Sequence, residues 1–167
     1  MPAWDPVTQG KARDALTALN TLGGYKENRF GKADEVDTIS WLIGTAAGWG
    51  GNPRNDAIYL PAFPAKNDGK TAYQLTLKDV PVDGFWSVSV YNAAGFFVKN
   101  DLGAYSFNNL TARKNADGGY TLHFGGDPKA INYLPIVPGW NYTVRLYRAR
   151  KEILDGSWKF PKAQPVR

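Results

Sequence analysis

The spacing of hydrophobic residues changes once along the chain, near residue 52. Before that point, between residues 12 and 19, alanines and leucines recur every three or four positions, as on one face of a helix. Asp5 followed by Pro6 is typical of a helix N-cap with proline at the first helical position. The glycine pair at 23–24 supplies a stop. The pattern predicts a helix over residues 6–22.

A second helix is expected from about Asp34, because the acidic residues at 34, 35 and 37 suit the first turn of a helix. Its inward side would carry these apolar residues: Val36, Ile39, Leu42, Ile43 and Ala46. The glycine-rich stretch 44–51 superficially resembles a phosphate-binding loop, but it follows a helix and lacks Gly-Lys-Ser/Thr. We interpret it as a helix exit that lets chain segments pack closely.

From Ile58 onward, apolar and polar residues alternate, as in strands with one buried face. The alternation is clearest at 73–77, at 85–91 and in the strands expected at 120–124 and 142–149. Asp-Gly at 117–118 is a strong hairpin-turn signal. Short strands separated by turn signals predict a mainly β fold, either an antiparallel sandwich or a barrel-like roll, preceded by two helices.

Composition fits one packed domain. The chain has 167 residues, 43% of them hydrophobic and 14% aromatic, enough to bury a single core. We expect a single domain over 1–167, with a helical part at 1–51 and a β-sandwich at 52–167. The high aromatic content is typical of both sandwich cores and ligand clefts, so it does not distinguish between them.

The net charge is +5, and the sequence pI is about 9.4. The basic residues are scattered and no recognition helix accompanies them, so nucleic acid is not an expected partner. The absence of cysteine excludes disulfides and thiolate-bound metals. No apolar run approaches a bilayer span, and residues 1–5 lack the features of a signal peptide. The sequence is compatible with more than one cellular location: the cytoplasm, or the periplasm or the cell exterior if a leader has been removed.

Several catalytic chemistries find no support. His123 is the only histidine, so a metal site is not expected, and no cofactor motif is present. As a lone general base, His123 remains a candidate. Ser87 and Ser89 lie within a strand rather than on a nucleophile elbow. The aspartates at 83, 101, 127 and 155 sit in turns, where local capping explains them better than paired-carboxylate catalysis.

One set of residues has the composition of a small-molecule site. Its members share the non-core side of three predicted strands: Ser87, Ser89, Tyr91, His123, Arg145 and Tyr147. If those strands are neighbours, Arg145 could hold a carboxylate or phosphate, and either tyrosine could orient it or donate a proton. The alternative is a hydrogen-bonded second core or an exposed sheet face.

Motifs spread over most of the chain resemble a bacterial family, the domain of unknown function 1214. The resemblance lies in Asn52-Pro53, Ala57-Ile58-Tyr59, Gly84-Phe85-Trp86-Ser87-Val88, Gly95-Phe96-Phe97, Tyr105-Ser106, Asn115-Ala116-Asp117-Gly118, Arg145-Leu146-Tyr147 and Leu154-Asp155-Gly156-Ser157-Trp158, with Tyr25–Gly31 as an approach segment. It implies a β-rich, jelly-roll-like fold, often joined to a companion, the domain of unknown function 1254, which we do not expect in this sequence. Asn92 replaces a residue that is often acidic in relatives, and the loop at 125–135 is short. The family implies no established reaction.

Three functions follow. The first is a non-catalytic domain that binds a small organic or carbohydrate-like ligand, or a partner protein, through the aromatic and polar face. The second is a cofactor-independent hydrolase, isomerase or lyase, with His123 or Tyr91 as acid or base and Arg145 stabilising an anion. The third is a homo-oligomeric assembly module, because a face covered by the companion in relatives would be free here.

Overall fold

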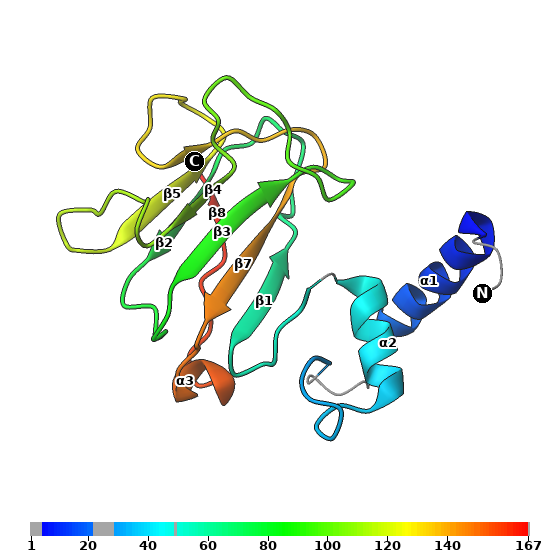
Figure 1. Ribbon diagram of the computed structural model, residues 1–167. Helices are drawn as coiled ribbons and strands as arrows, with labels where there is room; N and C mark the ends of the chain where they lie inside the picture. The colour runs from blue at the N-terminus through cyan, green and yellow to red at the C-terminus, as the bar shows by residue number, and fades with distance from the viewer. Residues whose placement is uncertain (1–4, 22–28, 49, 167) are drawn as a thin grey trace. The chain divides into compact units, whose positions relative to one another are not determined.

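The computed structural model describes residues 5–21, 29–48 and 50–166. The elements in chain order are α1 (Pro6–Thr21), α2 (Thr38–Ala47), β1 (Ala57–Ala62), β2 (Tyr73–Leu77), β3 (Trp86–Tyr91), β4 (Ser106–Asn108), β5 (Tyr120–Phe124), β6 (Tyr133–Leu134), β7 (Asn141–Tyr147), α3 (Lys151–Leu154) and β8 (Gln164–Pro165), as labelled in Figure 1. The expected glycine stop at 23–24 and most of the approach segment Tyr25–Gly31 lie outside the described residues.

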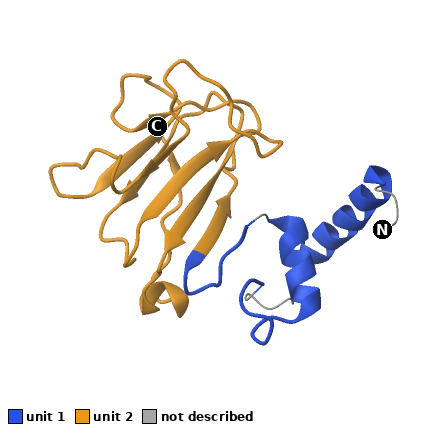
Figure 2. Cartoon of the chain, viewed as in Figure 1, with its two compact units in different colours: residues 1–57 blue, residues 58–167 orange. Residues whose placement is uncertain are grey.

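The chain divides into two compact units, residues 1–57 and residues 58–167 (Figure 2). The first unit holds α1 and α2, and the second holds nearly all of the strands. The boundary between the units lies at the start of β1, six residues after the change of pattern expected at 51–52. The single domain expected over residues 1–167 stays a prediction.

The first helix begins where the sequence predicts. Asp5 precedes α1 and accepts hydrogen bonds from the Val7 N–H, at 3.0 Å, and from the Thr8 hydroxyl, so it acts as the N-cap. These bonds lower the pKa of Asp5, the Thr8 hydroxyl contributing most. The helix runs to Thr21 in the described residues, and the predicted end at residue 22 lies outside them.

The second helix starts later than predicted. It begins at Thr38, because the Asp37 carboxylate accepts the Ser40 N–H at 2.9 Å and thereby caps the helix, while the residues near Asp34 form a turn. Fewer of the apolar residues of α2 are buried than predicted. Ile43 is fully buried, whereas Ile39 and Leu42 are 60% and 42% exposed.

Two glycines around the end of α2 permit close packing, as the sequence interpretation of this stretch expected. A Cβ at Gly44 would lie 2.8 Å from the Arg29 Cβ, and one at Gly51 would lie 2.1 Å from the Phe30 ring. Both distances are shorter than any tolerated contact between carbon atoms, so residues with side chains would displace these neighbours.

The second unit is built from two four-stranded sheets. The first sheet has the order β1-β7-β3-β4, and the second has the order β6-β5-β2-β8. Strand β3 pairs antiparallel with both β7 and β4, and β2 pairs antiparallel with β5 and β8. The pair β5 and β6 is parallel, so the second sheet is mixed. The fold is therefore mainly β, with two sheets and a few helices (Figure 1).

The inner faces of the two sheets share one buried core. Leu75 and Leu122 from the second sheet and Val88 and Leu146 from the first are fully buried in the same cluster. Phe124 of β5 stacks on Tyr142 of β7, with their ring centroids 5.2 Å apart. The alternation predicted from the sequence thus identifies the core side of every long strand.

Candidate functional site

Arg145 lies on the outer side of β7, next to the central strand β3 of the first sheet. Its Cα faces that of Ser87, and its side chain runs diagonally along β3. One terminal nitrogen, Nη1, donates to the Ser89 hydroxyl at 3.2 Å, and the other, Nη2, donates to the Tyr91 hydroxyl at 2.7 Å. The guanidinium carbon also lies 5.9 Å from the centre of the Tyr91 ring. We refer to Ser87, Ser89, Tyr91 and Arg145 as the outer polar cluster.

The outer polar cluster has spare hydrogen-bond donors. A guanidinium carries five N–H donors, and only two of those of Arg145 have a partner among the described residues. The Tyr91 and Ser89 hydroxyls accept from Arg145, so the hydrogen of each remains free to donate. Ser87 is 8% exposed and Ser89 is 6% exposed, so these hydroxyls are largely withdrawn from water. Unused donors in a partly dry environment favour an acceptor group from outside the cluster.

The strands of the first sheet contain no acidic residue that could neutralise Arg145. The sequences of β1, β3, β4 and β7 lack Asp and Glu altogether. Among residues 5–21, 29–48 and 50–166, Arg145 takes part in no ion pair within 4.0 Å. The outer polar cluster therefore carries an uncompensated positive charge that would attract an anion.

Aromatic rings flank the outer polar cluster on two sides. Beyond Tyr91, the Phe97 ring stacks on it at 4.9 Å with an interplanar angle of 9°, and Tyr105 follows at 5.3 Å from Phe97. On the other side, Tyr147 stacks on Phe85 at 4.2 Å. Phe97 is 51% exposed and Phe85 is 37% exposed, so ring faces and edges remain accessible to a ligand.

His123 lies in the other sheet. It belongs to β5, opposite Gln74 of β2, whereas the other five predicted site residues belong to β3 and β7 of the first sheet. Its Nδ1 lies 2.7 Å from the carbonyl oxygen of Ile131, which can only accept, so Nδ1 carries the proton and donates. The structure therefore brings together Ser87, Ser89, Tyr91, Arg145 and Tyr147 in one sheet and separates His123 from them.

Two of the four turn aspartates considered in the sequence analysis make local hydrogen bonds, as predicted: Asp127 accepts the Lys129 N–H at 2.9 Å, and Asp155 accepts the Ser157 N–H. Asp83 instead pairs with the distant Arg150 at 2.7 Å, and no side-chain hydrogen bond of Asp101 is found among the described residues.

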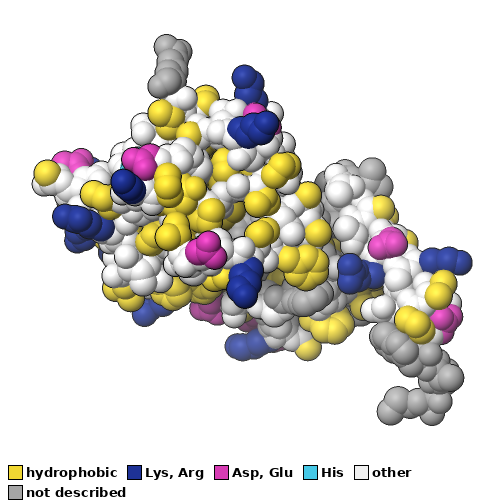
Figure 3. Space-filling model, turned by 90° about the horizontal axis from the view of Figure 1, so that it is seen from above, with side chains coloured by type: hydrophobic (Ala, Val, Ile, Leu, Met, Phe, Trp, Pro, Cys, Tyr) yellow, Lys and Arg dark blue, Asp and Glu magenta, His cyan; other side chains and the backbone are white. Residues whose placement is uncertain are grey.

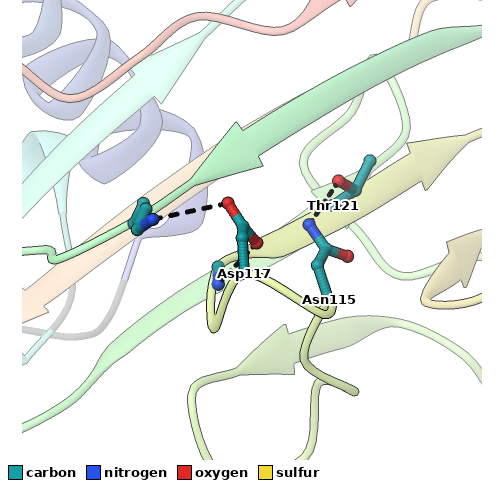
Figure 4. Close-up of polar contacts among 5 residues, drawn as sticks. Asn115, Asp117 and Thr121 are labelled. Carbon is teal, nitrogen blue, oxygen red and sulfur yellow. Dashed lines mark hydrogen bonds and ion pairs between the residues drawn. The ribbon is translucent and has the colours of Figure 1, made fainter.

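The aspartate of the predicted Asp117-Gly118 turn also makes local bonds. Asp117 accepts the Gly119 N–H at 3.0 Å, which lowers the pKa of Asp117, and also pairs with Lys78 at 3.5 Å (Figure 4). Asn115 in the same turn donates to the Thr121 hydroxyl at 3.0 Å (Figure 4). Asp155 accepts the Ser157 N–H at 3.0 Å, and this bond lowers its pKa. Such bonds give these carboxylates a structural role.

The family comparison agrees with this β unit. Residues 59–151 match the model of a family described as protein of unknown function (DUF1214). This chain belongs to that family. The match covers the strands from β1 to β7 except the first two residues of β1, and therefore the whole outer polar cluster. No curated protein matches the chain.

Two solved structures resemble this DUF1214 chain. The VPA0106 protein of Vibrio parahaemolyticus is 26% identical, with a TM-score of 0.74 over 100% of this chain. An uncharacterised protein of Burkholderia cenocepacia is 21% identical, with a TM-score of 0.54 over 72% of this chain, and this likeness concerns the fold alone. The DUF1214 chain spans 47% of the Vibrio chain and 32% of the Burkholderia chain.

Two features of the DUF1214 unit are not predicted from the sequence. Phe97 is part of a family motif, but only the tertiary structure places it on Tyr91. Asn132 has a left-handed backbone, with φ of 56°, and is 7% exposed. Its side chain accepts the Arg113 N–H at 2.7 Å and donates to the carbonyl oxygens of Arg113 and Thr121. The one sequence signal for this role is that residue 132 is an asparagine in a loop, because asparagine tolerates the left-handed backbone conformation.

The described parts of the chain contain neither a cluster of metal ligands nor a helix that could span a membrane. In residues 5–21, 29–48 and 50–166, no three His, Asp or Glu side chains are placed to share a metal ion. Within the same residues, no helix combines the length and apolar character that a bilayer span requires.

Proposed function

We propose that this DUF1214 domain binds a small, carbohydrate-like organic acid on the outer face of its first sheet, around Arg145. The observation that supports this is the surplus of donors in the outer polar cluster, where a guanidinium and three hydroxyls bind no carboxylate among the described residues. A carboxylate matches the flat fork of a guanidinium and accepts several hydrogen bonds at once.

The aromatic neighbours favour a ring in the same ligand. A sugar ring presents C–H groups to an aromatic face and hydroxyls at its edge. Phe97 and Phe85 supply exposed rings near opposite ends of the cluster, while Ser87 and Ser89 supply hydroxyls between them. A sugar acid such as glucuronate combines both properties and is the probe that we would use first.

The remaining sequence hypotheses have less support. An acid-base mechanism that joins His123 to Arg145 requires the two side chains at one site, but they belong to different sheets. A jelly-roll-like arrangement of the two sheets remains a proposal, supported by the shared core and by the family resemblance. Self-assembly and a partner protein likewise remain proposals, supported by exposed hydrophobic residues such as Phe96, which is 65% exposed.

The proposal predicts that glucuronate raises the melting temperature of the protein and that Arg145→Gln removes most of this effect. Loss of charge-assisted hydrogen bonds should weaken binding about 10- to 100-fold. Tyr91→Phe should weaken binding less, because the guanidinium remains. Thermal denaturation with increasing glucuronate measures both effects.

Arg113→Gln is the matched control, because Arg113 is exposed, lies outside β3 and β7, and carries the same charge. It should leave the glucuronate effect unchanged, and neutral glucose should produce little stabilisation of the wild-type protein. Equal responses to glucose and glucuronate would contradict the proposal. Unfolding of the Arg145→Gln variant without ligand would instead assign Arg145 a structural role.

A further inference from the structure

A cavity lies at one side of the β unit, and none of its lining residues belongs to the outer polar cluster. The segments 61–66 and 162–166 line it, together with Thr71, Tyr73 and Tyr142, and its volume is about 750 Å³. Strand β1 is an edge of the first sheet and β8 is an edge of the second, so the cavity lies where the two sheets end side by side. We call it the edge groove. Its volume falls in the range of small-molecule sites.

Two tyrosines supply hydrogen-bond donors to the edge groove. The Tyr73 hydroxyl accepts the Lys66 N–H at 3.0 Å, and the Tyr142 hydroxyl accepts the Ala163 N–H at 3.1 Å. Among the described residues neither hydroxyl has an acceptor for its own hydrogen. Burial raises the pKa of Tyr142, so its hydroxyl keeps that hydrogen. Both hydroxyls can therefore donate to a ligand oxygen.

The charge on the edge groove is positive. Lys66 and Lys162 line it, and no aspartate or glutamate does. In the part of the chain that the structure describes, neither lysine makes an ion pair within 4.0 Å. The charge of Lys66 contributes a little to the lowered pKa of Asp68, whose carboxylate accepts the N–H groups of Thr71 and Lys70.

The walls of the edge groove are apolar and unsuited to binding a further strand. Pro61 lies in β1, Pro64 follows it, and Pro165 lies in β8. Proline has no N–H to offer a ladder of hydrogen bonds, so these edges resist the addition of a peptide strand. Phe63 is 72% exposed at the groove and offers a ring to an apolar ligand.

Figure 3 shows hydrophobic side chains gathered over the β unit on the face that is uppermost in Figure 1, with the basic side chains set apart from one another.

We infer that the edge groove binds an apolar organic acid, a carboxylate attached to an aromatic or aliphatic body. The lysine ammonium groups attract the carboxylate, the tyrosine hydroxyls donate to it, and Phe63 with the prolines contacts the apolar body. This site is separate from the outer polar cluster, since none of its lining residues belongs to that cluster. The two sites should also prefer different acids, one polar and one apolar.

The test is a calorimetric and NMR titration of the full chain with 2-naphthoate. We expect saturable binding, with shifts of the amide signals of Lys66 and Ala163. The double variant Lys66→Gln with Lys162→Gln should weaken binding about tenfold or more, because charge-assisted bonds are lost. Tyr142→Phe should weaken it less. Lys129→Gln with Lys151→Gln is the matched control, since both residues are exposed and outside the groove, and it should leave the affinity unchanged.

Five results would overturn the inference. The first four are the absence of saturable binding, equal affinity for the neutral 2-naphthylmethanol, equal loss of affinity in the control variant, and loss of binding in Arg145→Gln. The fourth result would move 2-naphthoate to the outer polar cluster, so failure here is distinguishable from failure at that site. Amide shifts at the groove on simple dilution would assign it to contacts between copies of the chain, which would also overturn the inference.

Discussion

At the scale of single residues, the local environment decides whether a polar side chain is structural or available. Arg150 and Asp83 form an ion pair at 2.7 Å, and the Asp155 carboxylate accepts the Ser157 N–H of its own turn. Arg145, in contrast, has hydroxyl partners alone among the described residues. The sequence predicts Arg145, Tyr91 and the serines as a group because they share strand parity. The sequence could not exclude His123 from this group, because the alternation along a strand does not reveal which of two sheets the strand joins.

Asp68 gives a pH prediction at this scale. The N–H of Thr71, then the N–H of Lys70, lower the pKa of Asp68 to about 2. A lowered carboxylate pKa means that its stabilising effect is present above about pH 4 and is lost as pH falls towards 2. Asp68→Asn should therefore be less stable than the wild type at pH 6, and the difference should disappear near pH 2.

Urea denaturation at several pH values measures that difference in the free energy of unfolding. Asp56→Asn is the control, because Asp56 is exposed and makes the hydrogen bond of its turn through its backbone N–H, to the Pro53 carbonyl oxygen at 2.9 Å, so its substitution should give a smaller change over the same range. A difference between Asp68→Asn and the wild type that stays constant from pH 6 to pH 2 would contradict the explanation.

At the scale of elements, periodicity predicts the strands well and their neighbours poorly. Strand β5 covers the predicted residues 120–124, and α1 begins at the predicted Pro6. The start of α2 is wrong by about four residues, because a capping side chain at Asp37 outweighs the acidic residues before it. Pairing between β3 and β7 joins residues at least fifty positions apart, so no local sequence pattern predicts it.

Asn132 gives a prediction at this scale, since its side chain joins the segment before β6 to residue 113 and to β5. Asn132→Ala would remove three partly buried hydrogen bonds to backbone groups of Arg113 and Thr121. The expected loss is about 2–4 kcal/mol in the free energy of unfolding. Denaturant unfolding provides the value.

Asn115→Ala is the comparison for Asn132→Ala. It removes a single bond to the Thr121 hydroxyl in a solvent-accessible turn, so we expect a loss of about 0.5–1 kcal/mol. Similar losses for the two variants would show that Asn132 does not connect these segments as the structure indicates.

At the scale of the whole molecule, the buried core and the two proposed sites of the β unit lie in different places. The core occupies the space between the sheets, where Leu75, Leu122 and Val144 are at most 1% exposed. The proposed sites lie on the outer face of the first sheet and at the edge strands β1 and β8. The amino-acid composition gives the many aromatic residues and the net charge of +5. The fold shows in addition that Arg145 lies in a sheet whose strands contain no Asp or Glu.

The most direct test of the proposed function is an NMR titration of the full chain with glucuronate that follows the Arg145 side-chain Nε–H signal. We predict a saturable shift of this signal, accompanied by the amide signals of Ser87, Ser89 and Tyr91, and no comparable shift with glucose. An unchanged Arg145 signal at glucuronate concentrations that shift signals elsewhere in the protein would contradict the proposal.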